Sequence, residues 1–420
     1  MTTAIVNARI FDGERVLRET SVTIDGRTIA AIGGPIADGA DIVDATGATL
    51  LPGLIDAHVH TSAEALANAL RFGVTTELEM QGTNTRQNRA AIDDDDSLAD
   101  VRSAGFGITP PGGHPSELFP HDVRPGSDDR GGRGEPGERG GRGSDEAPPL
   151  MPFSRTPEEA VAFIPQLVAA GSDYIKFMID DGSVEGAPGL PMLDAATVDA
   201  GVAEAHRLGM LTVAHALTIE ATEIAMHARI DGLVHLFMDK PHTPEIIDLI
   251  ASSGAFVVPC IVLNASMMGI RPDAFAADPR VAGRLDEKWL ATLRSSFDKY
   301  PQGSIDDVFA SIRALHAAGV DLLVGTDVSA PFPFLGGMAH GASVHHELQL
   351  LVQAGLTPVE ALRAATSVPA RRFALTDRGR IAPGLRADLL LVDGDPTSSI
   401  SDTLSTRAVW RRGTRLAAQA

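Results

Sequence analysis

Side chains that can bind a metal ion stand at the ends of several apolar runs in this sequence. His58 and His60 flank Val59 at the end of the first such run. Successive side chains of a strand point to opposite faces, so residues two apart point the same way and the two imidazoles form a chelating pair. A neutral imidazole is a common ligand of divalent metal ions. Further candidates end other runs: Lys176, His215, His235 and Asp327.

Each candidate has an ordinary structural explanation when it is taken alone. A single histidine at a strand end is usually hydrogen-bonded, and a single lysine is usually solvated. The combination is different, because a buried lysine beside four imidazoles is costly unless its charge is removed or neutralised. The set as a whole therefore indicates a metal centre.

The elements that must position these residues alternate in type along the chain. Short runs rich in Val, Ile and Leu are separated by segments of helical period at 156–170, 194–208 and 304–318. This alternation is typical of βα units around a parallel sheet, and eight strands close an α/β (β/α)8 TIM barrel. The ligand candidates then fall at the carboxyl ends of strands one, four, five, six and eight. The predicted strands are 49–58, 74–80, 106–109, 173–178, 211–215, 232–237, 255–261 and 321–327.

The two ends of the chain have a different pattern. Residues 1–55 and 375–420 contain short alternating strands with Gly and Asp turns, such as 21–26 and 387–394. Such strands from the two termini can pair with each other, so we predict one small discontinuous β-sandwich domain beside a barrel of residues 56–374.

A Gly- and Arg-rich insertion interrupts the predicted barrel at 126–149. It has almost no apolar residue to bury, so we expect it to be flexible. Its position after the third predicted strand allows it to act as a lid over the site. An RGG-like RNA-binding segment is an alternative, but aromatic residues for stacking are missing and acidic residues flank it.

Composition limits the partners and the location of the protein. The formal net charge is −20, which repels a phosphate backbone, so a small-molecule substrate is expected and nucleic acid is not. No long uncharged apolar run and no leader pattern occur, so neither a membrane span nor secretion is expected. Cys260 is the only cysteine, which rules out an intrachain disulfide and fits the reducing cytoplasm. A homo-oligomer is left open.

The sequence closely resembles the amidohydrolase superfamily over nearly its whole length, apart from the insertion at 126–149. Within that superfamily it is most similar to the branch of imidazolonepropionase-like proteins and carboxylated-lysine prolidases. The resemblance is carried by the segments 51–60 (LPGLIDAHVH), 325–327 (GTD), 354–366 (AGLTPVEALRAAT), 377–384 (DRGRIAPG) and 387–388 (AD), together with Lys176, His215 and His235.

The resemblance implies the barrel and the sandwich, and a site with two divalent metal ions. Zinc is the first expectation, and manganese, cobalt, nickel and iron are the alternatives. Lys176 would carry a carbamate derived from carbon dioxide, which turns a buried cation into an anionic ligand that bridges the two ions. The remaining ligands would be His58, His60 and Asp327 for the first ion and His215 and His235 for the second.

The implied chemistry is hydrolysis of an amide-type C–N bond in an N-acyl amino acid, a dipeptide or a cyclic amide. A hydroxide shared by two divalent ions is a nucleophile near neutral pH, and the ions polarise the substrate carbonyl. Asp327 is placed to take the proton of this hydroxide and pass it to the leaving nitrogen. Asp327 and the modified Lys176 are therefore the predicted catalytic residues. His114, in a Gly-Gly-His turn, is predicted to contact substrate, although it could instead stabilise its loop.

Three other functions remain as alternatives. A mononuclear deaminase of the same superfamily would use His58, His60, His215 and Asp327 as ligands, with His235 holding the hydroxide. Such enzymes usually have a glutamate two or three residues after the fifth-strand histidine, but here the first acid is Glu220. A lactonase or organophosphate hydrolase would use the same metal centre. A non-catalytic assembly protein is expected to have lost ligands, which this chain has not.

Overall fold

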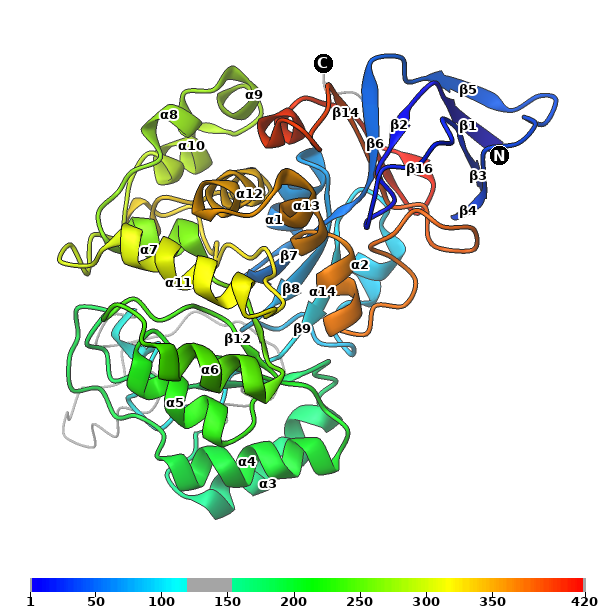
Figure 1. Cartoon of the computed structure of the whole chain (residues 1–420). Helices are drawn as coiled ribbons and strands as arrows, with labels where there is room; N and C mark the ends of the chain where they lie inside the picture. The colour runs from blue at the N-terminus through cyan, green and yellow to red at the C-terminus, as the bar shows by residue number, and fades with distance from the viewer. Residues whose placement is uncertain (1, 119–152, 418–420) are drawn as a thin grey trace, which may run out of the picture.

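The computed structural model describes residues 2–118 and 153–417, so the predicted insertion at 126–149 lies outside the described residues. Strands from both ends of the chain form two sheets on one side of the molecule, coloured blue and red in Figure 1. The four-stranded sheet has the order β4-β3-β1-β5, and the five-stranded sheet has the order β16-β15-β14-β6-β2. Their strands are β1 (Thr2–Val6), β2 (Arg9–Ile10), β3 (Val22–Asp25), β4 (Thr28–Ile32), β5 (Asp41–Asp44), β6 (Ala48–Pro52), β14 (Leu389–Asp393), β15 (Thr406–Arg411) and β16 (Thr414–Arg415).

Pairing between the chain ends builds the five-stranded sheet. Strand β6 pairs with β14 in antiparallel register, with Leu51 opposite Leu390. The two sheets share one cluster of buried apolar side chains, which includes Ile24, Leu389 and Trp410. Alternating burial along β3 places one face of that strand in this core, as expected for a sheet covered on one side.

The remaining strands are parallel and lie at the centre of the molecule. Strands β7 (Leu54–Val59), β8 (Val74–Glu79) and β9 (Asp100–Ser103) form one sheet. Strands β10 (Ile175–Met178), β11 (Thr212–His215), β12 (Gly232–Leu233) and β13 (Phe256–Val257) form another. Single parallel bridges lie outside these sheets: Ile108 with Phe177, Val257 with Leu322, and Val59 with Val328. Every residue of β7, β8, β10 and β11 is buried, as is typical of parallel strands with both faces covered.

Helices surround the central strands (Figure 1). The predicted helices at 156–170, 194–208 and 304–318 are confirmed as α3, α4 and α11, and each begins after a side chain that accepts a hydrogen bond from the first turn. Among the described helices, none combines the length and apolar character that crossing a membrane requires. The α-helices are α1 (Ala63–Arg71), α2 (Ala90–Asp94), α3 (Pro157–Ala169), α4 (Ala195–Arg207), α5 (Ile219–His227), α6 (Pro244–Ser253), α7 (Ile261–Met267), α8 (Asp273–Ala276), α9 (Pro279–Ala282), α10 (Glu287–Leu293), α11 (Ile305–Ala317), α12 (Ala342–Ala354), α13 (Pro358–Ala364) and α14 (Ser367–Arg372), with short 3₁₀ turns η1 (Ser116–Leu118), η2 (Pro333–Leu335) and η3 (Ile400–Leu404).

Several predicted strands differ from the structure. The runs 232–237 and 255–261 shorten to β12 and β13, and 321–327 contributes a single bridge, at Leu322. The run 49–58 is not one strand but parts of two, because the chain leaves the five-stranded sheet after β6 and enters the central sheet at β7. The third strand begins earlier than predicted, as β9 at Asp100–Ser103, and within the predicted run 106–109 Ile108 and Thr109 form parallel bridges with Phe177 and Phe153. Asp100 and Arg102 in β9 resemble surface residues in the sequence, but in the structure they pair with each other at 2.8 Å.

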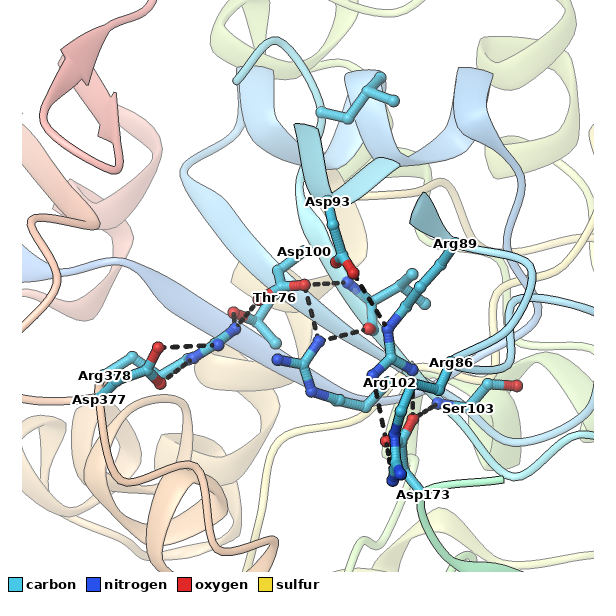
Figure 2. Close-up of polar contacts among 12 residues, drawn as sticks. Thr76, Arg86, Arg89, Asp93, Asp100, Arg102, Ser103, Asp173, Asp377 and Arg378 are labelled. Atoms are coloured by element: carbon cyan, nitrogen blue, oxygen red, sulfur yellow. Dashed lines mark hydrogen bonds and ion pairs between the residues drawn. The ribbon is translucent and has the colours of Figure 1, made fainter. Parts of the chain in front are cut away.

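A buried ion network joins β9 to the strands of the chain terminus. Asp100 forms ion pairs with Arg378 and with Arg386, whose Nη1 lies 2.9 Å from Asp100 Oδ2. Arg411 in β15 lies 3.9 Å from the same oxygen. Figure 2 shows Asp100 between Arg378 and Arg102, with the hydroxyl of Thr76 accepting a hydrogen bond from Arg378. The network therefore connects the central strands to the terminal sheet through charges that are removed from water.

Candidate metal centre

Three predicted ligands converge at the carboxyl end of β7. Asp327 Oδ1 lies 3.0 Å from Nε2 of His58 and 3.0 Å from Nε2 of His60. Yet this buried oxygen has no hydrogen-bond partner among the described residues. The His60 Nδ1–H donates to the backbone carbonyl of Gln81 at 3.1 Å, which leaves the lone pair on Nε2. Two imidazole nitrogens and a carboxylate oxygen that approach closely without hydrogen-bonding one another are arranged as metal ligands.

Asp56 fixes the positions of the two chain segments that carry these ligands. Its carboxylate accepts the backbone N–H of His58 at 3.2 Å and that of Thr326 at 3.1 Å, and it also accepts the Thr326 hydroxyl at 2.7 Å. The backbone N–H of Asp327 donates to the carbonyl of His58 at 2.8 Å. These contacts hold Asp327 at φ +59°, an uncommon conformation for a residue other than glycine.

The other three predicted ligands lie next to this group. Lys176 in β10 is 1% exposed, and its Nζ lies 3.3 Å from His58 Nε2. The His235 ring centre is 4.6 Å from that of His58 and 4.6 Å from that of His215. The structure thus brings together all six side chains that the sequence singled out as ligands.

Burial sets the protonation states of these groups. It lowers the pKa of His58 to about 3 and holds the pKa values of His215 and His235 well below 6.5, so all three imidazoles are neutral near pH 7. Burial also lowers the pKa of Lys176 to about 8, although Asp327 opposes the shift. For Asp327, burial alone would raise the pKa, but His58 and the other imidazoles keep it well below its usual value. Neutral imidazoles and an ionised carboxylate are the forms that bind metal ions.

Cys260 also reaches this group. Its Sγ lies 3.6 Å from His58 Nδ1, and its side chain is fully buried. His58, His235 and Cys260 have ligand atoms within 4.8 Å of one another. The residue therefore borders the candidate centre in addition to filling the core.

A second group of titratable residues adjoins His215. The predicted substrate contact His114 is buried, stacks on the His215 ring at 4.3 Å, and bonds to Glu117 through Nδ1 at 2.6 Å. Asp180 Oδ2 lies 3.0 Å from His215 Nε2, and Glu185 Oε1 lies 4.0 Å from His114 Nδ1. The sequence analysis missed these three acids. Asp180 and Glu185 follow β10 within nine residues of Lys176, and this placement after a ligand-bearing strand was the available signal.

A cavity of about 440 Å³ opens beside His60. Its lining includes His60, Glu79, Gln81, Phe106, Trp289 and Ser329. A larger cavity of about 630 Å³ is lined by Tyr174 and Leu211, which precede β10 and β11, and by none of the predicted ligands. The predicted ligands lie at the carboxyl ends of the strands, where the active sites of such folds form. The smaller cavity is therefore the candidate substrate-binding site.

The chain matches the amidohydrolase family over residues 49–415. An adenine deaminase of Methanoregula boonei is 43% identical over 68 residues, which are 16% of this chain and 12% of that protein. An imidazolonepropionase of Deinococcus deserti is 39% identical over 108 residues, 25% of this chain and 26% of the relative. The matched parts are thus well under half the length of these relatives. A crystal structure of a Xaa-Pro dipeptidase with bound methionine superposes with a TM-score of 0.74 at 23% identity, covering 99% of this chain and 100% of that one.

These matches place the chain in a class of hydrolases with mixed α/β structure. The chain belongs to the amidohydrolase family, as its resemblance to that superfamily predicted. The likeness to the dipeptidase structure supports the same fold over the whole chain. Metal ions are general in this family, and the His58, His60 and Asp327 group fits one.

Proposed function

We propose that this protein is a metal-dependent hydrolase that cleaves an amide-type C–N bond in a small molecule. The observation that carries the proposal is the position of Asp327 Oδ1, which lies 3.0 Å from Nε2 of His58 and 3.0 Å from Nε2 of His60. This buried oxygen has no hydrogen-bond partner among the described residues. The substrate class comprises N-acyl amino acids, dipeptides and cyclic amides. The family match and the fold of the Xaa-Pro dipeptidase support this choice.

The proposed architecture is an eight-stranded (β/α) barrel of residues 56–374 with a β-sandwich of residues 1–55 and 375–420. The bridges of Leu322 with Val257 and of Val328 with Val59 support a final strand between β13 and β7. A shared core between the two terminal sheets supports the sandwich. In this arrangement all the proposed ligands stand at one end of the barrel.

Two divalent ions, zinc in the first instance, fit the donor set. His58, His60 and Asp327 would hold one ion, and His215 and His235 the other. Lys176 would be a ligand of both after its neutral Nζ adds to carbon dioxide, forming a carbamate and releasing one proton. The lowered pKa of this lysine supports the step, because only the neutral amine reacts. Such ions lower the pKa of bound water and polarise a carbonyl oxygen.

The side chains of this protein supply orientation and proton transfer. Asp327 takes a proton at a carboxylate oxygen and delivers it to the leaving nitrogen of the substrate. Asp56 holds that carboxylate in place through Thr326 and the backbone. The cavity beside His60 binds the substrate, with Phe106 and Trp289 as apolar walls and Gln81 as a polar contact.

The test is metal content measured together with turnover. We expect two ions per chain and hydrolysis of at least one member of a panel of N-acyl amino acids, dipeptides and cyclic amides, with activity lost on chelation and restored by zinc. His60→Ala should lose metal and activity, whereas His227→Ala, which removes an exposed histidine of α5, should lose neither. A fully active, folded preparation with no metal would refute the proposal.

A deaminase is the second candidate, favoured by the local identity with adenine deaminases. Glu220, the first acid after His215, is exposed on α5, so it does not reach the centre as a proton donor. Ammonia release from aminated purines or pyrimidines, without hydrolysis of any amide in the panel, would favour the deaminase. Lactones and organophosphates in the same panel test the remaining hydrolase chemistries.

A further inference from the structure

Two exposed phenylalanines stand beside the cavity that the proposed function assigns to the substrate. Phe332 is 51% exposed and Phe334 is 61% exposed, and their rings stack with centres 5.5 Å apart. Every other phenylalanine, tyrosine and tryptophan side chain in residues 2–118 and 153–417 is buried or half-buried. Aromatic surface that is left open to water and grouped in one place is a common feature of binding sites.

The chain connects this aromatic pair to the cavity. Ser329, Ala330 and Pro331 line the cavity, and Phe332 follows them directly. The 3₁₀ turn η2, which carries Phe334, packs on α10, the helix of the cavity wall residue Trp289. A hydrogen bond of 2.6 Å from the Ser295 hydroxyl to the carbonyl of Pro333 holds this turn in place. The aromatic pair therefore continues the chain segment that forms one edge of the cavity.

The carboxylates that line the cavity have no opposite charge beside them in its wall. Glu64 and Glu79 are both lining residues, and no lysine or arginine in the described part of the chain lines the cavity. The Thr61 hydroxyl donates to Glu77 Oε2 at 2.5 Å, so its proton is not offered to a ligand. A carboxylate that entered this cavity would lose its water without gaining a counter-charge, which is costly.

A buried histidine next to the cavity is already neutralised. His340 meets Trp289 edge to face, with ring centres 5.2 Å apart. Its Nδ1–H donates to Glu77 at 2.9 Å and its Nε2–H donates to the carbonyl of Ser329 at 3.0 Å. Because both N–H groups have acceptors, His340 is a cation balanced by Glu77, and it orients the Ser329 segment. It offers no free N–H to an anionic substrate.

We propose that the substrate is an uncharged amide with an aromatic group, and that Phe332 and Phe334 are specificity-determining residues that pack on that group. This inference rests on the proposed function and narrows its substrate class to members without a free carboxylate. Aromatic contact favours binding, and Glu64 and Glu79 repel anionic analogues. An N-acyl amino acid is then a poor substrate, whereas its carboxamide is a good one.

The first test uses two compounds of the same shape that differ in charge, N-acetylphenylalanine and its carboxamide. Acetate release by the metal-loaded enzyme gives kcat/KM for each. We expect kcat/KM to be at least ~10-fold higher for the carboxamide, because like charges in a closed site repel. Equal values, or a preference for the acid, would overturn the inference and leave the proposed hydrolase intact.

The second test removes the aromatic pair with the double substitution Phe332→Ala and Phe334→Ala. We expect KM for the carboxamide to rise roughly 5-fold with kcat unchanged, as for a contact made equally in the bound and transition states. N-acetylglycine carboxamide, which lacks the ring, should show no change. Ile42→Ala is the control, since it removes another exposed apolar side chain, 53% exposed in β5.

An unchanged KM for the ring-bearing carboxamide in the double variant would contradict the role of the pair. If the double variant instead abolishes a concentration-dependent dimer while KM is unchanged, the pair is an interface between two copies of the chain and the inference fails. Both phenylalanines are exposed, so the double variant is expected to fold.

A binding measurement separates failure of this inference from failure of the proposed function. Trp289 and Trp410 are the only two tryptophans of the chain, and Trp410 lies in the core of the terminal sheets. In Trp410→Phe, N-acetylphenylalanine carboxamide should produce a saturable change in the fluorescence of Trp289, and the acid should bind more weakly. Should Trp410→Phe not fold, the difference between wild type and Trp289→Phe gives the same signal. Equal binding of acid and carboxamide, or no response to either, overturns the inference even if no amide is hydrolysed.

Discussion

At the scale of single residues, the position of Asp327 in the candidate site is closely defined. Its Oδ1 approaches two imidazoles, and its backbone adopts a positive φ that Asp56 and Thr326 help to hold. Strain of this kind is usually found where function requires an exact position. The two roles proposed for Asp327, metal ligation and proton transfer, can be tested separately with a substitution that keeps the shape of its side chain.

Asp327→Asn is expected to lower turnover by about 100-fold or more, because the amide still offers an oxygen ligand but cannot accept a proton. Metal content should fall only in part. Turnover at saturating substrate and zinc per chain are the measurements. Near wild-type turnover in this variant would assign proton transfer to another group.

Lys176→Ala is expected to remove one metal ion and nearly all activity while the protein stays folded. The cause is the loss of a bridging ligand from a fully buried position. Short carboxylic acids should restore part of the activity by occupying the vacated space. Lys240→Ala is the control, since its side chain is 70% exposed. If Lys176→Ala retains two ions and full turnover, the lysine has no metal-binding role.

At the scale of elements, the start of α7 depends on a carboxyl group from another helix. Glu347 in α12 is fully buried, and its carboxylate accepts the backbone N–H of Ile261 at 2.8 Å and of Val262 at 2.9 Å. These are the first two residues of α7, directly after Cys260. An acidic side chain at a helix N-terminus satisfies free N–H groups. The contact thereby fixes the segment that carries Cys260 against His58.

Glu347→Ala is expected to lower the free energy of unfolding by about 3 kcal/mol, because it leaves two buried N–H groups without an acceptor. Urea unfolding measures the change. Gln353→Ala, at an exposed position of the same helix, should alter stability by less than about 0.5 kcal/mol. Equal effects of the two substitutions would show that the Glu347 contact contributes nothing to stability.

At the scale of the whole molecule, the terminal sheets are tied to the central strands by the Asp100 network (Figure 2). Burial alone would raise the pKa of Asp100, but Arg378, Arg102 and Arg386 hold it well below 3.8. A carboxyl whose pKa is lower in the folded state stabilises the fold above its unfolded pKa. That contribution is lost as the pH falls below about 3.8 toward the folded-state pKa.

Asp100→Asn is expected to lower the free energy of unfolding at pH 7 by about 3 to 5 kcal/mol, because it leaves buried guanidinium groups without their counter-charge. The difference from wild type should be the same at pH 5 and should narrow only below about pH 4, since Asp100 then becomes protonated in the unfolded chain. Urea unfolding at these pH values is the measurement. A difference that stays constant to pH 3 would contradict the assigned pKa shift.

Much of the fold and the site could be predicted because the signals are local. The helical period at 156–170 depends on neighbours along the chain, and the spacing of His58 and His60 follows from the alternation of a strand. All six predicted ligands come from such local patterns, since each stands at or near the end of an apolar run.

Features that depend on contacts between residues far apart in the sequence were decided only by the tertiary structure. Strand β9 was missed because charged residues such as Asp100 and Arg102 are usually exposed to solvent. Their burial in this strand depends on ion pairs, some of them with residues far away in the sequence. Asp180 and Glu185 were missed for a related reason, since an acid in a loop has the same appearance whether it faces water or an imidazole. The sequence by itself determined which residues are candidates for the chemistry. Their partners were decided by the fold, because the cost of burying a charge depends on groups that only folding brings together.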